Sequence, residues 1–331
     1  DCVVVNAMGH GFYLVHYSDE LRDRLLRAMH DHLAPIERFN LLNDSWALTL
    51  ANRVPLTAYL EMTAHFRGER DKNVWAVLFA SFLAIHRMVD AGDRPGFESF
   101  VRDRVGGILD DLGWAPRPGE NELTGQLRGD AIRALGVLGN DAAAQQKAAE
   151  VYAQTVHAPF SASADVLAAV IPVLAHVGEQ TRYDEFWEQF RAAKTPQAEQ
   201  RFLHALPVFR QAPLVQQTLA RTLDGGIRTQ DAPFVLRSLF YAPHSRAEAW
   251  SFVKNNWNAI NRLYPPVGVR RMMEGIVGLA TPELERDVHQ FVQERQVDLG
   301  GKVLAQYLEQ LRIAVSLGER EGKELSAYLS S

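Results

Sequence analysis

The sequence predicts an all-α protein built from many short helices, and three observations lead to this fold class. From Asp19 onward, apolar residues recur at intervals of three and four positions, which is the spacing of one helix face. The periodic segments are about 10 to 16 residues long, and brief runs of Gly, Pro, Asn or Asp separate them. Pairs of such helices recur at roughly 30 to 45 residues, as in HEAT and armadillo arrays. We therefore predict an irregular HEAT/armadillo-like α-solenoid that is superhelical and concave, because a compact bundle of this size would need longer helices.

The first seventeen residues follow a different pattern. Val3 to Val5 form a β-branched run, Asn6 to Gly11 supply turn residues, and Phe12 to Tyr17 are again apolar and aromatic. This pattern predicts a β-hairpin. Because an isolated hairpin is at best marginally stable in water, we interpret residues 1–17 as the remnant of a β-domain and residues 18–331 as the helical domain.

Capping residues and helix-breaking residues indicate where the predicted helices begin and end. Ser18 can cap the first helix, Pro35 limits it, and Pro95 lies in the first turn of the fifth. The stretch from Gly113 to Gly119 is the clearest loop. After a first helix between Ser18 and Pro35 and a second that ends near Asn52, the predicted helices are 56–66, 71–90, 95–112, 122–138, 141–156, 162–177, 182–194, 196–206, 212–223, 229–239, 245–256, 257–264, 267–279, 282–292, 302–316 and 319–329.

Composition excludes several classes of partner. The chain has 331 residues and a net charge of −5, which argues against nucleic acid or an anionic membrane as a partner. No apolar run approaches the roughly 20 residues of a transmembrane helix. The single cysteine, Cys2, excludes an internal disulfide framework and favours a reducing compartment, so we expect a cytoplasmic protein, with an exported parent left open. Because the chain opens on Asp1 rather than on Met, we expect a piece of a longer protein.

No catalytic motif is found in the sequence. None of the eleven histidines is followed by glutamate, which excludes an H-E-x-x-H zinc motif. A G-x-G-x-x-G loop, a phosphate-binding loop and a G-x-S-x-G elbow are also missing. We therefore expect no catalytic residue, no metal ligand and no cofactor in this chain alone.

Three basic positions have both a structural and a functional interpretation. Arg87, beside His86 at the end of a strongly apolar helix, could present a cation or simply extend its head group to water. Arg210 follows a helix terminus, where a cation interacts favourably with the helix dipole. Arg128 lies in an otherwise apolar helix and predicts an internal ion pair between adjacent repeats.

The chain also resembles a known family in several segments, in the family's order. The segments near the N-terminus are similar to an N-x-x-x-x-G-Y-Y-R-V-x-Y stretch, an R-x-x-L-x-x-D-x-x-x-L stretch and an E-x-x-x-x-x-W stretch of aminopeptidase N–like (gluzincin) zinc aminopeptidases. The residues that carry this resemblance are Asn6, Gly11, Phe12, Tyr13, Val15 and Tyr17, then Arg38, Leu42, Asp44, Ala47 and Leu48, then Glu69 and Trp75, and later Ile227 to Asp231, Trp250, Phe252, Asn256 and Trp257. The chain departs from the first stretch at Leu14 and His16.

The resemblance implies a specific place for this chain in a larger enzyme. It implies the end of a β-sandwich followed by a HEAT-like C-terminal domain, similar to that of endoplasmic-reticulum aminopeptidases. In such enzymes this domain caps the active-site chamber and controls peptide access and length selection, while the zinc and the catalytic residues belong to another domain. The resemblance further implies that His86, Arg87 and Arg210 bind the C-terminus of a peptide substrate, with His86 in place of the usual tyrosine.

Two function classes follow from these observations. The first is the non-catalytic C-terminal domain of a zinc-dependent aminopeptidase, whose partners are the catalytic and β-sandwich domains of the parent and a peptide substrate. The alternative is a free-standing HEAT-like scaffold for protein partners. In either case, unpaired edges in residues 1–17 could lead the isolated chain to self-associate.

Overall fold

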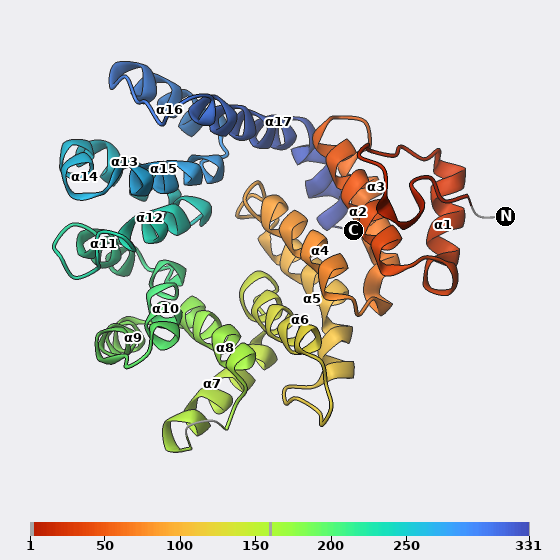
Figure 1. Cartoon of the computed structure of the whole chain (residues 1–331), viewed down its shortest axis with the longest axis horizontal. Coiled ribbons are helices and arrows are strands. Elements are labelled where there is room, and N and C mark those ends of the chain that lie inside the picture. Colours follow the sequence, from red (N-terminus) through yellow and green to blue (C-terminus); the bar gives the residue numbers. More distant parts are fainter. Residues whose placement is uncertain (1–2, 159–160, 331) are drawn as a thin grey trace. The chain divides into compact units, whose positions relative to one another are not determined.

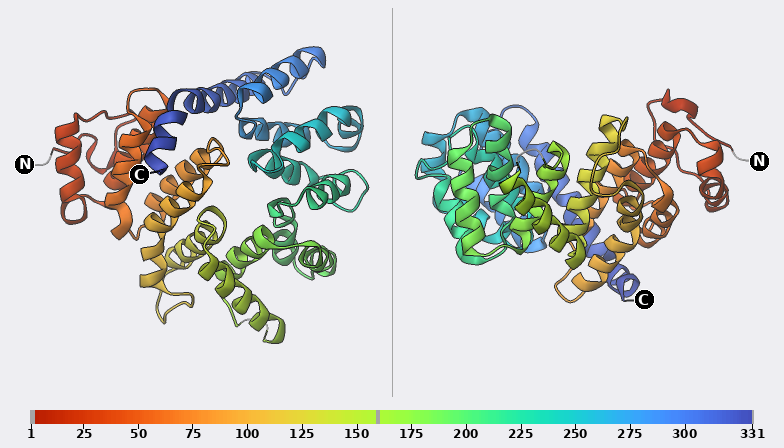
Figure 2. Two further views of the ribbon diagram at one scale, coloured as in Figure 1. Left: turned by 180° about the vertical axis from the view of Figure 1, so that it is seen from behind. Right: turned by 90° about the horizontal axis from the view of Figure 1, so that it is seen from below.

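The computed structural model describes residues 3–158 and 161–330, and in these residues the chain is all α-helical. Seventeen α-helices follow one another along the described chain (Figure 1). The views from behind and from below contain no strand for these residues (Figure 2). The all-α prediction is therefore confirmed for the part of the chain that the structure describes.

The chain divides into two compact units. The first comprises Asp1–Val170 and Arg320–Ser331, and the second comprises Ile171–Glu319. Since each unit is described by itself, the concave superhelix remains a prediction, as does a single helical domain from residue 18 to residue 331. None of the described helices is long and apolar enough to cross a membrane.

The helices agree with most of the predicted segments. Those of the first unit are α1 (Asp19–His32), α2 (Pro35–Leu50), α3 (Leu56–Thr63), α4 (Lys72–His86), α5 (Arg94–Leu112), α6 (Glu122–Arg133) and α7 (Ala142–His157). Those of the second are α9 (Gln180–Ala192), α10 (Pro196–Leu203), α11 (Ala212–Arg221), α12 (Ala232–Tyr241), α13 (Arg246–Asn255), α14 (Trp257–Leu263), α15 (Pro266–Met273) and α16 (Pro282–Glu294). Helices α8 (Ala164–Val177) and α17 (Val303–Leu329) contain residues of both units. Short turns of other helix types are η1 (Ala7–Gly9), η2 (Ala64–Gly68), η3 (Ala134–Leu138), η4 (Leu206–Val208) and η5 (Glu274–Gly278).

Side-chain caps explain where many of these helices begin. The Ser18 side chain accepts a hydrogen bond from the Leu21 N–H, as the sequence predicts. Such a cap satisfies a backbone donor that has no partner within the helix. The same arrangement is formed at other helix starts by Asp71, Asn121, Asp141, Thr195 and Thr281.

A buried tryptophan joins helices in the core of each unit. In the first unit, Trp75 is 1% exposed and its Nε1 donates a hydrogen bond to the Glu69 carbonyl at 2.9 Å. In the second, the Trp250 ring lies 5.1 Å from the Phe291 ring, and its Nε1 donates to Asp287 Oδ2 at 2.9 Å. Both indoles bury a large apolar area while their polar N–H keeps a partner, so they anchor the helices that they join.

The predicted β-hairpin is wrong for residues 3–17, the part of that segment that the structure describes. These residues form a coil with one 3₁₀ turn, η1. The Tyr17 hydroxyl accepts a hydrogen bond from the Val5 N–H at 2.9 Å and donates one to the Val5 carbonyl at 3.2 Å. Asp44 Oδ2 on α2 accepts from the Val15 N–H at 3.0 Å. Because side chains satisfy these backbone groups, the segment is tied to α2 without a strand ladder.

The predicted break near Gly318 is also wrong. Residues 302–316 and 319–329 were expected as two helices, but α17 runs unbroken from Val303 to Leu329. Glycine inside a helix costs only about 1 kcal/mol relative to alanine. Contacts beyond it offset this cost, since Leu325 is buried and Glu321 Oε2 accepts a hydrogen bond from the Leu56 N–H at 3.1 Å.

Candidate functional site

His86 and Arg87 lie together at the C-terminal end of α4, where His86 is the last helical residue and Arg87 is the C-cap. The His86 ring lies 5.6 Å from the Phe97 ring on α5, and its Nε2 lies 2.5 Å from Nη1 of Arg94. Because a guanidinium group can only donate, Arg94 is the donor in this contact. The half-buried His86 ring thus joins α4 to α5.

Arg87 ends a solvent-facing stripe of α4. Phe79, Leu83 and Arg87 follow one another at four-residue spacing, which places them on one face of the helix and its C-cap. Leu83 is 43% exposed, and Phe79 and Arg87 are half-buried. The stripe combines exposed apolar surface with a cation at its end, a combination that can contact both an apolar side chain and a carboxylate.

Arg210 lies in the second unit, in the loop between η4 and α11. Its Nε donates a hydrogen bond to the His176 carbonyl at 2.9 Å, in the last turn of α8. A cation near a helix C-terminus is favourable, but the helix is α8 and not the one just before Arg210 in the chain, for which the sequence suggested this role. The side chain is exposed, and no carboxylate of the described residues forms an ion pair with it. His86 and Arg87 thus lie together in the first unit, and Arg210 lies in the second.

Two ion pairs in the first unit each have one buried partner. Arg128 on α6 is fully buried and donates to both carboxylate oxygens of Glu120 and to the Gly113 carbonyl at 3.0 Å. The ion pair predicted for Arg128 is thus present, and its partner Glu120 lies in the loop just before α6. That the pair joins adjacent repeats stays a prediction. The hydrogen bond from Arg128 outweighs desolvation and lowers the pKa of the Glu120 carboxyl below its ordinary value.

The second pair joins Arg38 on α2 to Glu69, and the sequence reasoning named both residues without pairing them. Glu69 is 2% exposed and accepts hydrogen bonds from Arg38 and from the backbone N–H groups of Arg70 and Asp71. Burial alone would raise the pKa of the Glu69 carboxyl, but these hydrogen bonds outweigh burial and the pKa is lowered. Both pairs hold loops against helices.

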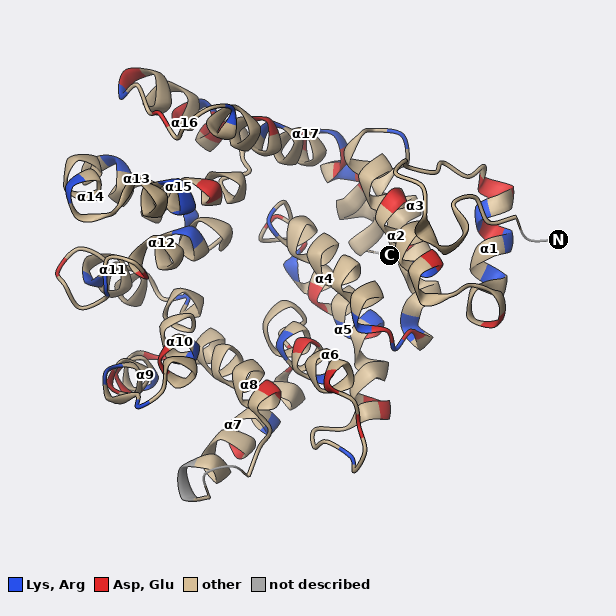
Figure 3. Ribbon diagram, viewed as in Figure 1, with Lys and Arg blue, Asp and Glu red and all other residues tan. Residues whose placement is uncertain are grey.

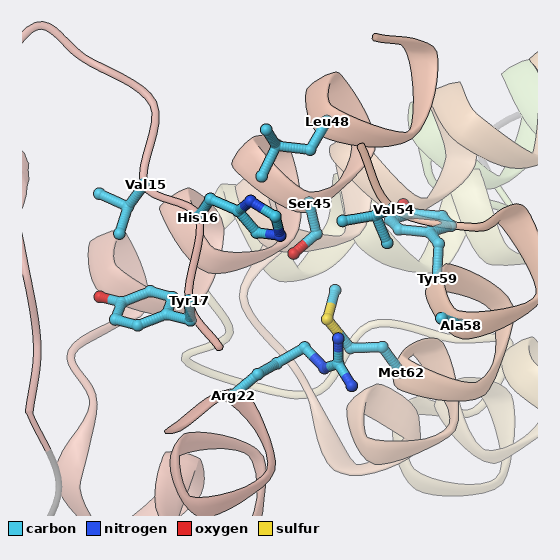
Figure 4. A pocket seen from close by; sticks show the side chains of 10 residues that line it. All are labelled: Val15, His16, Tyr17, Arg22, Ser45, Leu48, Val54, Ala58, Tyr59 and Met62. Atoms are coloured by element: carbon cyan, nitrogen blue, oxygen red, sulfur yellow. The ribbon is translucent and has the colours of Figure 1, made fainter. Parts of the chain in front are cut away.

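A small pocket lies beneath residues 15–17 in the first unit (Figure 4). His16, Arg22, Tyr59 and Met62 are among the residues that line it. Its volume of about 10 Å³ has room for a single water molecule. The pocket is therefore too small for a peptide side chain.

A wider groove of about 220 Å³ lies between α1 and the α3–η2 segment. Its charged lining includes Arg22, Asp23, Arg27 and Glu61, so the groove carries both signs of charge. The sequence reasoning missed it, because these residues come from segments that meet only in the fold. Among the described residues, no group of three or more His, Cys, Asp or Glu side chains could hold a metal ion.

Comparisons with known proteins find similarity to one domain family and to several aminopeptidases. The model of the ERAP1-like C-terminal domain matches residues 2–313. Aminopeptidase M1 of Arabidopsis thaliana is 26% identical over 344 residues, which cover 99% of this chain and 39% of that protein. Aminopeptidase M1-A of Oryza sativa subsp. japonica is 26% identical over 94% of this chain and 36% of its own length. Human endoplasmic reticulum aminopeptidase 2 is 23% identical over 77% of this chain and 27% of its own length.

The chain thus spans less than two-fifths of the length of each of these relatives. The domain match covers nearly all of the chain, including His86, Arg87 and Arg210. On this evidence, the chain belongs to the ERAP1-like C-terminal domain family, the C-terminal domain of M1 aminopeptidases.

Proposed function

We propose that this chain is the non-catalytic C-terminal domain of a zinc-dependent aminopeptidase that removes N-terminal residues from peptides. The observation that carries the proposal is the domain match over residues 2–313, together with the aminopeptidase names of the relatives. The described residues offer no cluster of metal ligands, so zinc and the catalytic groups would belong to another domain of the parent. In the parent, this domain would cap the active-site chamber and govern which peptides enter and how long they are. The single cysteine supports a cytoplasmic parent.

We further propose that Arg87 and Arg210 each contact the C-terminal carboxylate of a peptide, with His86 supporting the first position. The exposed Leu83 beside Arg87 and the exposed guanidinium of Arg210 support this role. Charge-assisted hydrogen bonds from arginine to carboxylate are strong and directional. His86 contributes by contacting Arg94 and Phe97, which fixes the end of α4 from which Arg87 extends.

A kinetic comparison of free-acid and C-amidated peptides on the full-length protein tests this role. Arg87→Ala and Arg210→Ala are each expected to lower kcat/KM for the free acid by about tenfold, because each removes a hydrogen bond to a charged group. The same variants should leave kcat/KM for the amide unchanged. Arg191→Ala is the matched control, since Arg191 is an exposed arginine with a single i,i+3 partner.

If wild type and both variants turn over the acid and the amide equally, the carboxylate role is wrong. Turnover of N-terminally blocked peptides at the same rate as free peptides would instead contradict the aminopeptidase assignment.

We also propose that residues 3–14 contact the β-sandwich and catalytic domains of the parent. Six apolar side chains in this segment are exposed, and Phe12 is exposed over its full surface. The exposed apolar residues are Val3, Val5, Met8, Phe12, Tyr13 and Leu14. A cluster of this kind on a soluble domain marks a protein contact, and in the isolated chain a second copy can take the place of the missing domain.

The isolated chain is therefore expected to self-associate as its concentration rises. Phe12→Ser with Leu14→Ser should reduce this association, because both exposed side chains lose their apolar surface. Light scattering at increasing concentration measures the effect. Val267→Ser is the control, since Val267 is also exposed but lies in the second unit. Equal association of wild type and the double variant would contradict this role for residues 3–14.

A further inference from the structure

The second unit carries a concentration of arginine side chains on α12 and α15. Arg237 lies on α12, and Arg270 and Arg271 lie on α15, which packs against it. In Figure 3 these two neighbouring helices carry blue ribbon segments, which mark Lys and Arg, and a red segment, which marks Asp or Glu, lies along α15. Arg270 and Arg271 are exposed and Arg237 is half-buried, and core packing does not require the two exposed side chains.

One carboxylate is shared by two of these arginines. Arg237 Nη1 lies 3.1 Å from Glu274 Oε2, and Arg271 Nη1 lies 3.4 Å from the same oxygen. Within the described chain, no carboxylate forms an ion pair with Arg270, which is exposed. Glu274 thus places one negative charge against the two arginines that it contacts, and the exposed Arg270 adds a further positive charge that can bind an anion.

The fold holds this cluster in place. A Cβ atom at Gly275 would lie 2.9 Å from Arg237 Cγ and 3.0 Å from Arg237 Cα, so only glycine allows η5 to approach α12 this closely. This approach brings Glu274 to Arg237. The Tyr241 hydroxyl donates to the Glu274 carbonyl at 3.3 Å, and the Arg237 guanidinium lies 5.2 Å from the Phe234 ring centre. The aromatic contact fixes the direction of the guanidinium group.

The same surface also offers apolar contacts. Val267, Arg270, Arg271 and Glu274 are spaced at i, i+3, i+4 and i+7, which places them along one side of α15 and its end. Val267 is 63% exposed. An apolar side chain beside a row of arginines suits a peptide that carries carboxylate side chains among apolar ones. A nucleic acid fits less well, because Glu274 and the negative net charge of the chain would repel phosphates.

We propose that Arg237, Arg270 and Arg271 form a binding surface for acidic side chains of peptides, which gives the parent a preference for substrates with Asp or Glu away from the cleaved end. The preference among substrates rests on the proposed aminopeptidase function. The binding itself does not, because it needs no catalysis. Guanidinium groups bind carboxylates with two parallel hydrogen bonds, which favours acidic side chains over neutral isosteres.

Fluorescence anisotropy with two labelled twelve-residue peptides tests the proposal. One peptide contains several Glu residues among Ala and Leu, and the other has Gln at each of these positions. The wild-type chain is expected to bind the Glu peptide about tenfold more tightly at low salt, with the difference shrinking at high ionic strength. Arg270→Gln with Arg271→Gln should abolish this difference. Both side chains are exposed, so the fold is expected to persist and is checked by circular dichroism.

The control variant removes two exposed arginines elsewhere in the same unit. Arg191→Gln with Arg286→Gln changes the net charge by the same amount, and each of these arginines has only a weak i,i+3 partner. This control should bind the Glu peptide as the wild type does. Equal weakening by the control, equal binding of the two peptides, or tighter binding of a single-stranded oligonucleotide would overturn the proposal. Failure of the free-acid and amide comparison on the full-length protein would leave this binding result unchanged, so the two proposals fail separately.

Discussion

Replacing Arg128 with methionine is expected to destabilise the first unit by about 3 to 5 kcal/mol, because removal of one partner of a buried ion pair leaves the other uncompensated. The methionine cannot donate to Glu120 or to the carbonyls of Leu112 and Gly113, which Arg128 now holds. The loop from Gly113 to Glu120 should then open. Urea denaturation measures the loss of stability, and tryptic cleavage after Arg117 in this loop measures the opening.

A double variant separates the buried charge from the lost packing. Arg128→Met with Glu120→Met removes both members of the pair, and such a replacement by apolar groups is often neutral or stabilising. The double variant should therefore be more stable than Arg128→Met alone. Equal losses in the single and double variants would show that the uncompensated carboxylate of Glu120 is not the cause. Arg286→Met, at an exposed arginine, should change stability by less than about 0.5 kcal/mol.

Helix content could be predicted because it depends on local signals. Apolar periodicity and caps such as Ser18 act within one or two turns, and the structure contains helices in nearly every predicted segment. The predicted helix break at Gly318 is wrong because long-range contacts keep α17 continuous. Leu325 is buried and Glu321 caps the start of α3, which is far away in sequence.

Long-range contacts also overrode the local pattern in residues 3–17. The alternating apolar residues of this segment are typical of a strand, but a strand needs a neighbouring backbone to pair with. In the structure the Asp44 carboxylate and the Tyr17 hydroxyl take the place of that backbone. The alternation of apolar residues in the sequence does not indicate that distant side chains will bind the backbone in this way.

The candidate site could be predicted only in part. The adjacent positions of His86 and Arg87 follow from the sequence itself, and the resemblance to a family drew attention to them. The contacts of His86 with Arg94 and Phe97 depend on the packing of α5 on α4 and could not be predicted. The doublet Arg270–Arg271 was a usable signal in an acidic chain, but its relation to Arg237 depends on the close approach that Gly275 allows.

Replacing Glu69 with glutamine is the second substitution with a large expected effect. The carboxylate accepts hydrogen bonds from the Arg38 guanidinium and, at 2.8 Å, from the backbone N–H groups of Arg70 and Asp71. Glutamine keeps the shape but turns an amide donor toward these donors, and it leaves Arg38 without its counter-charge. The expected loss is about 3 kcal/mol, or a melting temperature lower by about 6 to 12 °C. Calorimetry measures the shift, and Glu61→Gln at an exposed carboxylate is the matched control.

The stability that Glu69 contributes is expected to fall as the pH is lowered. In the folded chain, hydrogen bonds outweigh burial and hold the pKa of Glu69 below its ordinary value. At a pH between the folded and the unfolded pKa of Glu69, the unfolded chain therefore binds more protons than the folded chain. The stability that Glu69 contributes is complete above the unfolded pKa of about 4.3 and is lost as the pH falls through the lower folded value. The difference in stability between wild type and Glu69→Gln should therefore be constant near neutral pH and shrink below about pH 4. A difference that stays constant down to the acid limit would mean that glutamine destabilises through shape, and that the charge on Glu69 does not hold α2 to the start of α4.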